Sequence, residues 1–243
     1  MSFRAERGTC CSFSRSVAKY IDIHRFVTPW NARINLTSVR EPEQIVTRHF
    51  GESLFAARVL FPRVPHTSRF SKGRDLNDQR PTTNDVHLID IGSGAGFPGL
   101  PIKIWAPDIH LTLIESNQKK ATFLREVIRA TRFTNVDVFA DRAEDFPSPQ
   151  PGEPRTVTLR AVERFGRILP VAASLVPPDG RLALLIGDSQ VPGAHKLVPA
   201  FSWSPPVKIP LSSARVLLIG RNRACGTNQD SHRTNRVNSG TRG

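Results

Sequence analysis

The sequence predicts an α/β protein with a doubly wound, mainly parallel sheet. Short apolar runs alternate with stretches of helical periodicity across residues 86–220. A glycine-rich loop follows the first apolar run directly. In 243 residues, 39% hydrophobic and 23% charged side chains are enough for one packed domain. Strands separated by helical lengths pair in parallel as βαβ units, which gives this fold class.

The first 61 residues predict a loose start followed by helices. Residues 1–15 are polar, and we expect them to be disordered. Residues 16–61 read as an N-terminal helical segment of two helices joined by a turn. Pro29 disfavours regular continuation of the first helix, whose apolar spacing is set by Val17, Tyr20, Ile21, His24 and Val27.

The second helix of this segment is predicted over residues 41–61. Its start, Glu41-Pro42-Glu43, suits a first helical turn. We expect its buried stripe to comprise Ile45, Phe50, Leu54 and Val59.

Two further segments lack periodicity. Residues 62–85 mix proline, serine, threonine, asparagine and charges, which predicts a flexible insertion. Residues 221–243 have little apolar surface to bury, and we expect a basic disordered tail.

The central region, 86–220, is predicted as the ligand-binding core. Its predicted strands are 86–91, 109–116, 135–141, 156–162, 181–188 and 214–220, and its predicted helices are 99–106, 117–133 and 167–176.

The chain is strongly basic, with a net charge of +13. Five arginines and one aspartate give residues 221–243 a charge of +4, which leaves +9 for the rest. Such a surplus favours a polyanionic partner, with nucleic acid as the first candidate. Three cysteines without a C-x-x-C spacing argue against a disulfide framework or a zinc site and suit the cytoplasm. No apolar run has membrane-spanning length.

The glycine loop after the first strand is the main candidate site. Gly94, Gly96 and Gly99 have the G-x-G-x-x-G spacing of dinucleotide-binding loops, whereas Gly92, Gly94 and Gly96 form G-x-G-x-G. In a doubly wound sheet, ligands bind at the carboxyl ends of the strands. The loop is therefore a site candidate for either ligand.

Two residues favour S-adenosylmethionine over a dinucleotide. Asp90, expected near the mouth of the loop, would repel a pyrophosphate but suit an amino group or sulfonium. Pro98 has no N–H to offer to a phosphate. Glu115 ends the second strand, where an acid binds ribose hydroxyls in both cofactor classes. In this architecture the loop carrying Asp141, Arg142 and Glu144 borders the adenine.

Several motifs then occur in the order of a known family. The chain resembles the RsmG (GidB) methyltransferases, which methylate N7 of a guanine in bacterial 16S ribosomal RNA. The matching stretches are "WNARINLTSVREPEQIVTRHFGESL" (30–54), "LIDIGSGAGFPGLPIKI" (88–104), "LTLIESNQKKATFLREV" (111–127), "DRAEDF" (141–146), "LRAV" (159–162) and "DGRLALLIG" (179–187). The stretch before the glycine loop is the most specific.

The resemblance implies a Rossmann-like methyltransferase fold and roles for named residues. It implies that Gly92 and Phe97 contact S-adenosylmethionine, that Glu115 binds its ribose, and that Ala143 and Glu144 lie beside its adenine. The candidate cofactor-binding set is Asp90, Gly92, Gly94, Gly96, Phe97, Glu115, Ala143, Glu144 and Arg160. The candidate catalytic residues are Arg160 and His49, and the candidate RNA-binding residues are Arg48, Lys119, Lys120 and Arg142.

The chain departs from the family pattern at three places. Glu52 stands where the family usually has aspartate, Leu159 precedes Arg160 where serine is usual, and Ile186 precedes Gly187 where lysine is usual. These departures motivate an alternative, a catalytically weak RNA-binding member of the fold. The G-x-G-x-x-G spacing motivates another, a nucleotide-linked oxidoreductase.

Methylation at guanine N7 does not require a general base or a metal. N7 has a free lone pair and no proton to lose, so the enzyme needs alignment and exclusion of water rather than a general base. The seven histidines show no metal-ligand spacing, and we expect no metal. We expect a cytoplasmic monomer that acts on 16S rRNA or the small ribosomal subunit.

Overall fold

The computed structural model describes residues 7–37, 39, 41–62, 86–149, 153, 155–160 and 164–223. The fold is built on one eight-stranded sheet of order β3-β2-β1-β4-β5-β8-β6, with β7 paired to β8. The strands are β1 (His87–Ile91), β2 (His110–Ile114), β3 (Val136–Phe139), β4 (Arg155–Arg160), β5 (Arg181–Gly187), β6 (Phe201–Trp203), β7 (Val207–Lys208) and β8 (Arg215–Asn222).

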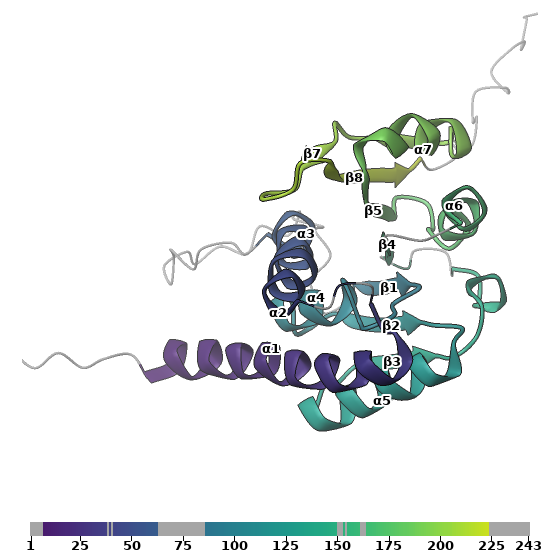
Figure 1. Ribbon diagram of the computed structural model, residues 1–243. Helices are drawn as coiled ribbons and strands as arrows, with labels where there is room; N and C mark the ends of the chain where they lie inside the picture. Colours follow the sequence, from purple (N-terminus) through teal and green to yellow (C-terminus); the bar gives the residue numbers. More distant parts are fainter. Residues whose placement is uncertain are drawn as a thin grey trace, which may run out of the picture.

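The helices cover both faces of this sheet (Figure 1). They are α1 (Arg7–Ile34), α2 (Pro42–Gln44), α3 (Glu52–Leu60), α4 (Gly99–Trp105), α5 (Gln118–Thr131), α6 (Phe165–Ser174) and α7 (Val191–Leu197), with the π-helix η1 (Ile45–Gly51) and the 3-10 turns η3 (Ala143–Asp145) and η4 (Asp188–Gln190). In Figure 1, α3 and α4 lie on one side of the sheet, and α6 and α7 lie on the other. This arrangement confirms the predicted doubly wound α/β fold.

The strand order reverses between β1 and β4, which marks the switch point of the sheet. β1 pairs in parallel with both β2 and β4, and Ile91 at its end is in register with Ile114 and Leu159. The carboxyl ends of these three strands therefore meet at one edge. Ligands of doubly wound sheets bind at this place.

Two apolar clusters form the core, one on each face. One holds Leu88, Leu111 and Leu113 of the sheet with Leu100 of α4 and Leu124 of α5. The other packs α6 and α7 against alternate residues of the same strands. Because both faces are covered, the central strands are buried along nearly their whole length.

The end of the sheet departs from the parallel pattern that the sequence predicts. β8 runs antiparallel to β5, with Gly187 opposite Arg215 and Arg181 opposite Arg221. The connection from β5 to β8 contains α7, β6 and β7 rather than one crossover helix. The sequence pattern gave no sign of α7, β6 or β7, which are short. β8 also reaches Asn222, so the predicted boundary between core and tail at residue 220 is wrong.

The N-terminal region is more helical than predicted. α1 starts at Arg7, so residues 7–15 are helical rather than disordered, and Pro29 lies inside the helix. A proline removes one helical hydrogen bond, but tertiary packing holds this part of α1 in place. Val27 is fully buried, and Trp30 meets Phe123 of α5 edge-on at 5.5 Å.

The second predicted helix is divided into α2, η1 and α3. Ile45 and Phe50 are buried as expected, but Leu54 is only partly buried and Val59 is exposed. Ala56, Ala57 and Leu60 are buried instead. A π-helix has more residues per turn than an α-helix, so it rotates the helix that follows and shifts the buried stripe.

The N-terminal segment packs on the same face as α4 and α5. The Tyr20 hydroxyl donates to the carbonyl of Pro101 at 3.3 Å, and Trp105 Nε1 donates to the carbonyl of Phe61 at 2.9 Å. Its buried side chains belong to the same apolar cluster as those of the sheet. It is therefore part of the core domain.

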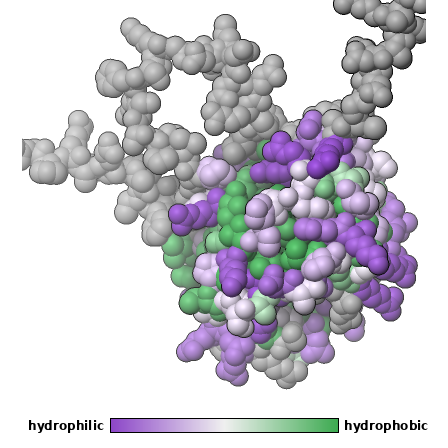
Figure 2. Space-filling model, turned by 90° about the horizontal axis from the view of Figure 1, so that it is seen from above, coloured by the Kyte–Doolittle hydropathy of each residue, from purple (hydrophilic) through white to green (hydrophobic). Residues whose placement is uncertain are grey.

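The surface carries apolar as well as polar areas. Figure 2 shows an apolar area in the middle of one face with hydrophilic side chains around it. In the described part of the chain, no helix combines the length and apolar character that a membrane span requires. The predicted insertion (all but Pro62) and the predicted tail beyond Arg223 lie outside the described residues.

Candidate active site

The glycine loop turns sharply after β1. Gly92, Gly94 and Gly96 all have positive φ, of 66°, 56° and 86°. At Gly96 a side chain would also collide with Leu100 at the start of α4. The sequence needs glycine there because only glycine adopts this conformation at no steric cost.

Asp90 lies beneath this loop and holds it. Its Oδ2 accepts a hydrogen bond from the Gly99 N–H at 3.1 Å, and its Oδ1 accepts from the Thr158 hydroxyl at 2.9 Å. The side chain is fully buried, and burial raises the pKa of its carboxyl to about 6. The expectation that Asp90 lies at the mouth of the loop is therefore wrong, because its carboxylate joins the loop to α4 and β4.

Glu115 fastens the other side of the loop. Its Oε2 accepts from the Gly94 N–H and its Oε1 from the Asn117 N–H, both at 2.9 Å. The side chain is 8% exposed. Glu115 thus connects the end of β2 to the glycine loop, and its contact with a ribose stays a prediction.

A pocket of about 270 Å³ opens at this edge of the sheet. It is lined by Ile91, Gly92, Ile114, Ser116, Asp141, Arg142, Ala143, Glu144, Arg164, Arg167 and Ile168. Four of the predicted site residues line it: Gly92, Arg142, Ala143 and Glu144. Asp90, Gly94, Gly96, Phe97 and Glu115 do not, although they build the loop beside it.

Three pocket residues at the start of α6 could not be identified from the sequence. Arg164, the N-cap of α6, and Arg167 and Ile168 belong to no recognised motif, and the sequence pattern predicts this helix only from residue 167. The sheet topology was the available signal, because a helix that follows β4 begins at the edge where β1 and β2 end.

His49 packs against the glycine loop from the N-terminal segment. Its ring stacks on Phe97, with centroids 5.0 Å apart and planes at 22°. Its Nε2 is 2.7 Å from the Thr37 hydroxyl, whereas its buried Nδ1 has no hydrogen-bond partner among the described residues. Burial, with smaller effects from nearby arginines, lowers the pKa of His49 to about 3. The imidazole is therefore neutral at physiological pH.

Next to His49, Glu52 bridges two arginines. Arg160 donates to Glu52 Oε2 at 3.1 Å and to the carbonyl of Arg48 at 2.8 Å. Arg215 Nε lies 3.0 Å from Glu52 Oε1, an ion pair without hydrogen-bond geometry. Burial lowers the pKa of the Arg160 guanidinium, while Glu52 opposes this shift. The structure thus brings Arg48, His49 and Arg160 together, and sequence analysis missed Arg215.

The remaining predicted RNA contacts lie at the same edge. Lys119 and Lys120 stand in the first turn of α5, where the Asn117 side chain accepts from both of their backbone N–H groups. Among the described residues, no cluster of three or more potential metal-ligating side chains is present.

The strand order and the glycine loop at the switch point define a class, the Rossmann-like α/β folds. Among solved structures, the fold is similar to that of a predicted O-methyltransferase from Agrobacterium tumefaciens, with a TM-score of 0.50. The two chains are 17% identical, and the match covers 59% of this chain and 77% of that one.

Within this class the sequence matches one family. The family model "rRNA small subunit methyltransferase G" (GidB) matches residues 77–203. The chain is 34% identical to Ribosomal RNA small subunit methyltransferase G of Roseiflexus castenholzii, over 84% of this chain and 82% of that protein. The chain belongs to the rRNA small subunit methyltransferase G family, which confirms the resemblance that the motifs carry.

Two other relatives with the same name are more similar over shorter stretches. That of Desulforamulus reducens is 38% identical over 51% of this chain, and that of Nitrosomonas eutropha is 36% identical over 64%. The chain spans 43% and 61% of these two proteins, less than two thirds of each.

Proposed function

We propose that the protein transfers a methyl group from S-adenosylmethionine to N7 of a guanine in 16S rRNA. The observation that carries the proposal is the pocket beside Gly92, which lies at the switch point of the sheet in a chain of this family. The names of the relatives, which are ribosomal RNA small subunit methyltransferases, support the substrate.

The pocket suits the nucleoside part of the cofactor. Ile91, Ile114 and Ile168 supply apolar walls for an adenine ring, and the Asp141 and Glu144 carboxylates supply acceptors for amino and hydroxyl groups. The backbone at Gly92 lets a ligand approach closely. When bound, S-adenosylmethionine supplies an electrophilic methyl group on a sulfonium.

The chain's own residues align the base and keep water out. Guanine N7 attacks with its lone pair, so no side chain has to remove a proton. His49 agrees with this, because an imidazole with a pKa of about 3 is a poor base near neutral pH. We assign His49 and Arg160 to positioning of the base and the methionine end, and Arg48, Lys119, Lys120 and Arg142 to contacts with RNA phosphates.

The same proposal includes the setting of the reaction. The protein acts as a cytoplasmic monomer on 16S rRNA or on the small ribosomal subunit. Scarce cysteines and the ribosomal target support the compartment. Sedimentation of the purified protein with and without small subunits tests the oligomeric state and the preferred form of the substrate.

Calorimetric titration with S-adenosylmethionine, with NADH as the control ligand, is the first test. We expect binding of S-adenosylmethionine alone, and loss of this binding in Gly92→Asp, because an aspartate fills the pocket and is strained at a φ of 66°. Binding of NADH alone would instead indicate an oxidoreductase.

Transfer of a labelled methyl group to small-subunit RNA is the second test. Mapping of the label to a guanine N7 would support the proposed reaction. RNA binding without transfer would indicate the alternative of a catalytically weak RNA-binding protein.

A further inference from the structure

The mouth of the pocket carries three exposed arginines. Arg142 follows β3, and Arg164 and Arg167 stand at the start of α6. In the described part of the chain, only Arg167 has an acidic partner among these three, Glu144 at 3.8 Å. Exposed pairs of this length bind weakly. The three guanidinium groups are therefore available to an external anion.

Helix stability does not explain where these cations stand. Arg164 is the N-cap residue of α6 and Arg167 lies in its first turn, which holds no acidic residue. Lys119 and Lys120 occupy the first turn of α5, which also lacks an acidic residue. The N-terminus of a helix already bears partial positive charge, so cations there oppose the helix dipole.

The first turns of α5 and α6 contribute positive potential at the same edge of the sheet. α5 follows β2 and α6 follows β4, so both begin at the carboxyl edge where the pocket opens. Two helix dipoles and five cations (Arg142, Arg164, Arg167, Lys119 and Lys120) outnumber the Asp141 and Glu144 carboxylates that line the same pocket, so the potential at the mouth is positive. Such a potential attracts a chain of phosphates.

We propose that Arg142, Arg164 and Arg167 hold the RNA backbone across the mouth of the cofactor pocket, so that bound RNA closes the pocket. This proposal rests on the proposed function. It follows that S-adenosylmethionine enters before RNA binds. Methylated RNA leaves before S-adenosylhomocysteine can leave.

A pair of double variants tests the contact with RNA. Arg164→Gln with Arg167→Gln removes two cations at the mouth. As the matched control, Arg125→Gln with Arg129→Gln removes two exposed cations of α5 that lie beyond its first turn. The affinity for a 16S rRNA transcript is measured at several salt concentrations. For two lost phosphate contacts we expect the slope of log affinity against log salt to become shallower by about 1.4, with no change in the control. An unchanged slope in the mouth variant would overturn the proposal.

Release of labelled S-adenosylhomocysteine tests the closure. In the unaltered protein, saturating 16S rRNA should slow release roughly tenfold or more, because a cover must open before the ligand leaves. The mouth variant should release its ligand nearly as fast with RNA as without. Equal release rates with and without RNA in the unaltered protein would refute closure.

The outcomes separate this proposal from the proposed function. Failure to methylate 16S rRNA, despite binding of S-adenosylmethionine, would remove the substrate and this proposal together. Methylation with an unchanged salt slope and unhindered release would overturn this proposal and leave the proposed function standing.

Discussion

At the scale of single residues, Glu52 is a buried charge that two arginines share. It is 4% exposed and is the shared anion of Arg160 and Arg215, which come from different strands. The family usually has the shorter aspartate here. The extra methylene of glutamate lengthens the reach of the carboxylate from α3 towards β4 and β8.

Glu52→Gln should destabilise the protein strongly. The buried Arg160 and the partly exposed Arg215 would lose the carboxylate that they share, and breaking a buried ion pair costs about 3–5 kcal/mol. The free energy of unfolding in urea measures the loss.

Glu126→Gln is the matched control for this substitution. Its partner Arg129 lies 2.7 Å away, but both side chains are largely exposed, 41% and 78%. We expect less than about 0.5 kcal/mol there. Equal effects of the two substitutions would show that the Glu52 bridge does not stabilise the fold.

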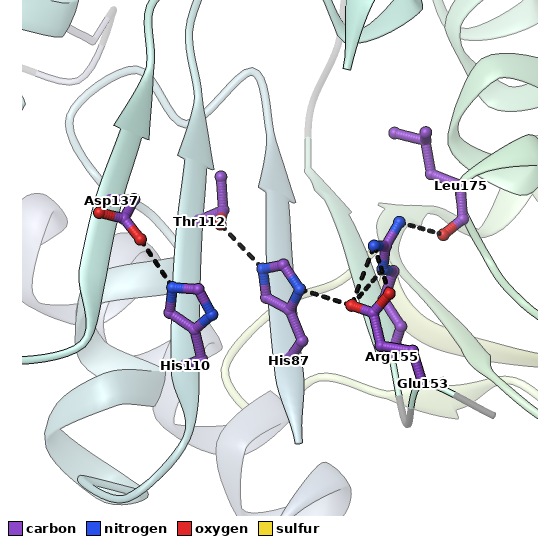
Figure 3. A network of polar contacts seen from close by, with 7 residues as sticks. All are labelled: His87, His110, Thr112, Asp137, Glu153, Arg155 and Leu175. Carbon is purple, nitrogen blue, oxygen red and sulfur yellow. Dashed lines mark hydrogen bonds and ion pairs between the residues drawn. The ribbon is translucent and has the colours of Figure 1, made fainter. Parts of the chain in front are cut away.

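At the scale of elements, a polar network joins four strands at the edge opposite the pocket (Figure 3). His87 at the start of β1 binds Glu153 through Nδ1 at 2.7 Å and Thr112 of β2 through Nε2 at 2.8 Å. His110 at the start of β2 stacks on His87 at 4.5 Å and binds Asp137 of β3.

The same network continues into β4. Arg155, 5% exposed, pairs with Glu153 at 2.7 Å and donates to the carbonyl of Leu175. His87 and the permanently charged Arg155 therefore share the Glu153 carboxylate. The network fastens the amino ends of the strands without any group from the pocket.

Stability should fall as the pH drops below about 6.5. Burial lowers the pKa of His87 and brings that of His49 to about 3, so at these two groups the unfolded chain binds protons that the folded chain does not. The raised pKa of Asp90, about 6, opposes this loss, but it is one group against two. His87→Gln should lose less unfolding free energy between pH 7.5 and pH 5.0 than the unaltered protein.

The matched control is His195→Gln on α7, which lies outside this network. It should keep the full pH dependence, as measured by urea unfolding at both pH values. A slope that His87→Gln leaves unchanged would show that His87 takes up its proton as easily in the folded state.

At the scale of the whole molecule, β8 decides where the chain can be shortened. The Asn222 N–H donates to the carbonyl of Gly180, its carbonyl accepts from the Asp179 N–H, and its side chain donates to Val176 at 2.8 Å. Arg221 is in register with Arg181 of β5. These contacts close the turn between α6 and β5.

Removal of residues 224–243 should leave the melting temperature within a few degrees of that of the whole chain. Removal of residues 221–243 should lower it clearly more, because it takes away the Asn222 hydrogen bonds, each worth about 1 kcal/mol. Thermal unfolding of the two shortened chains makes the comparison. Equal melting temperatures would show that the end of β8 does not contribute to stability.

Much of this fold follows from local sequence. Alternating apolar runs and helical stretches place β1 to β5, because buried parallel strands need continuous apolar residues. The loop that starts at Gly92 could be predicted because closely spaced glycines directly follow an apolar strand. Pro29 and Asp90 show the limit, since tertiary packing overrides a helix breaker and burial hides a carboxylate.

Non-local pairings could not be predicted from the sequence. Arg215 meets Glu52 only because β8 turns back beside β5, and Arg164 reaches the pocket only because the strand order reverses at β1. No motif spacing carries that information, which comes from topology.

The π-helix η1 and its neighbours have a consequence for any attempt to isolate the pocket. A fragment starting at β1 would keep the sheet and the glycine loop, yet it would lose His49 from the face of Phe97 and Glu52 from Arg160. It would also uncover the apolar surface that α1 and α3 now shield. The pocket half of the fold therefore depends on the helices before β1 for part of its apolar cover and for two of its side-chain contacts.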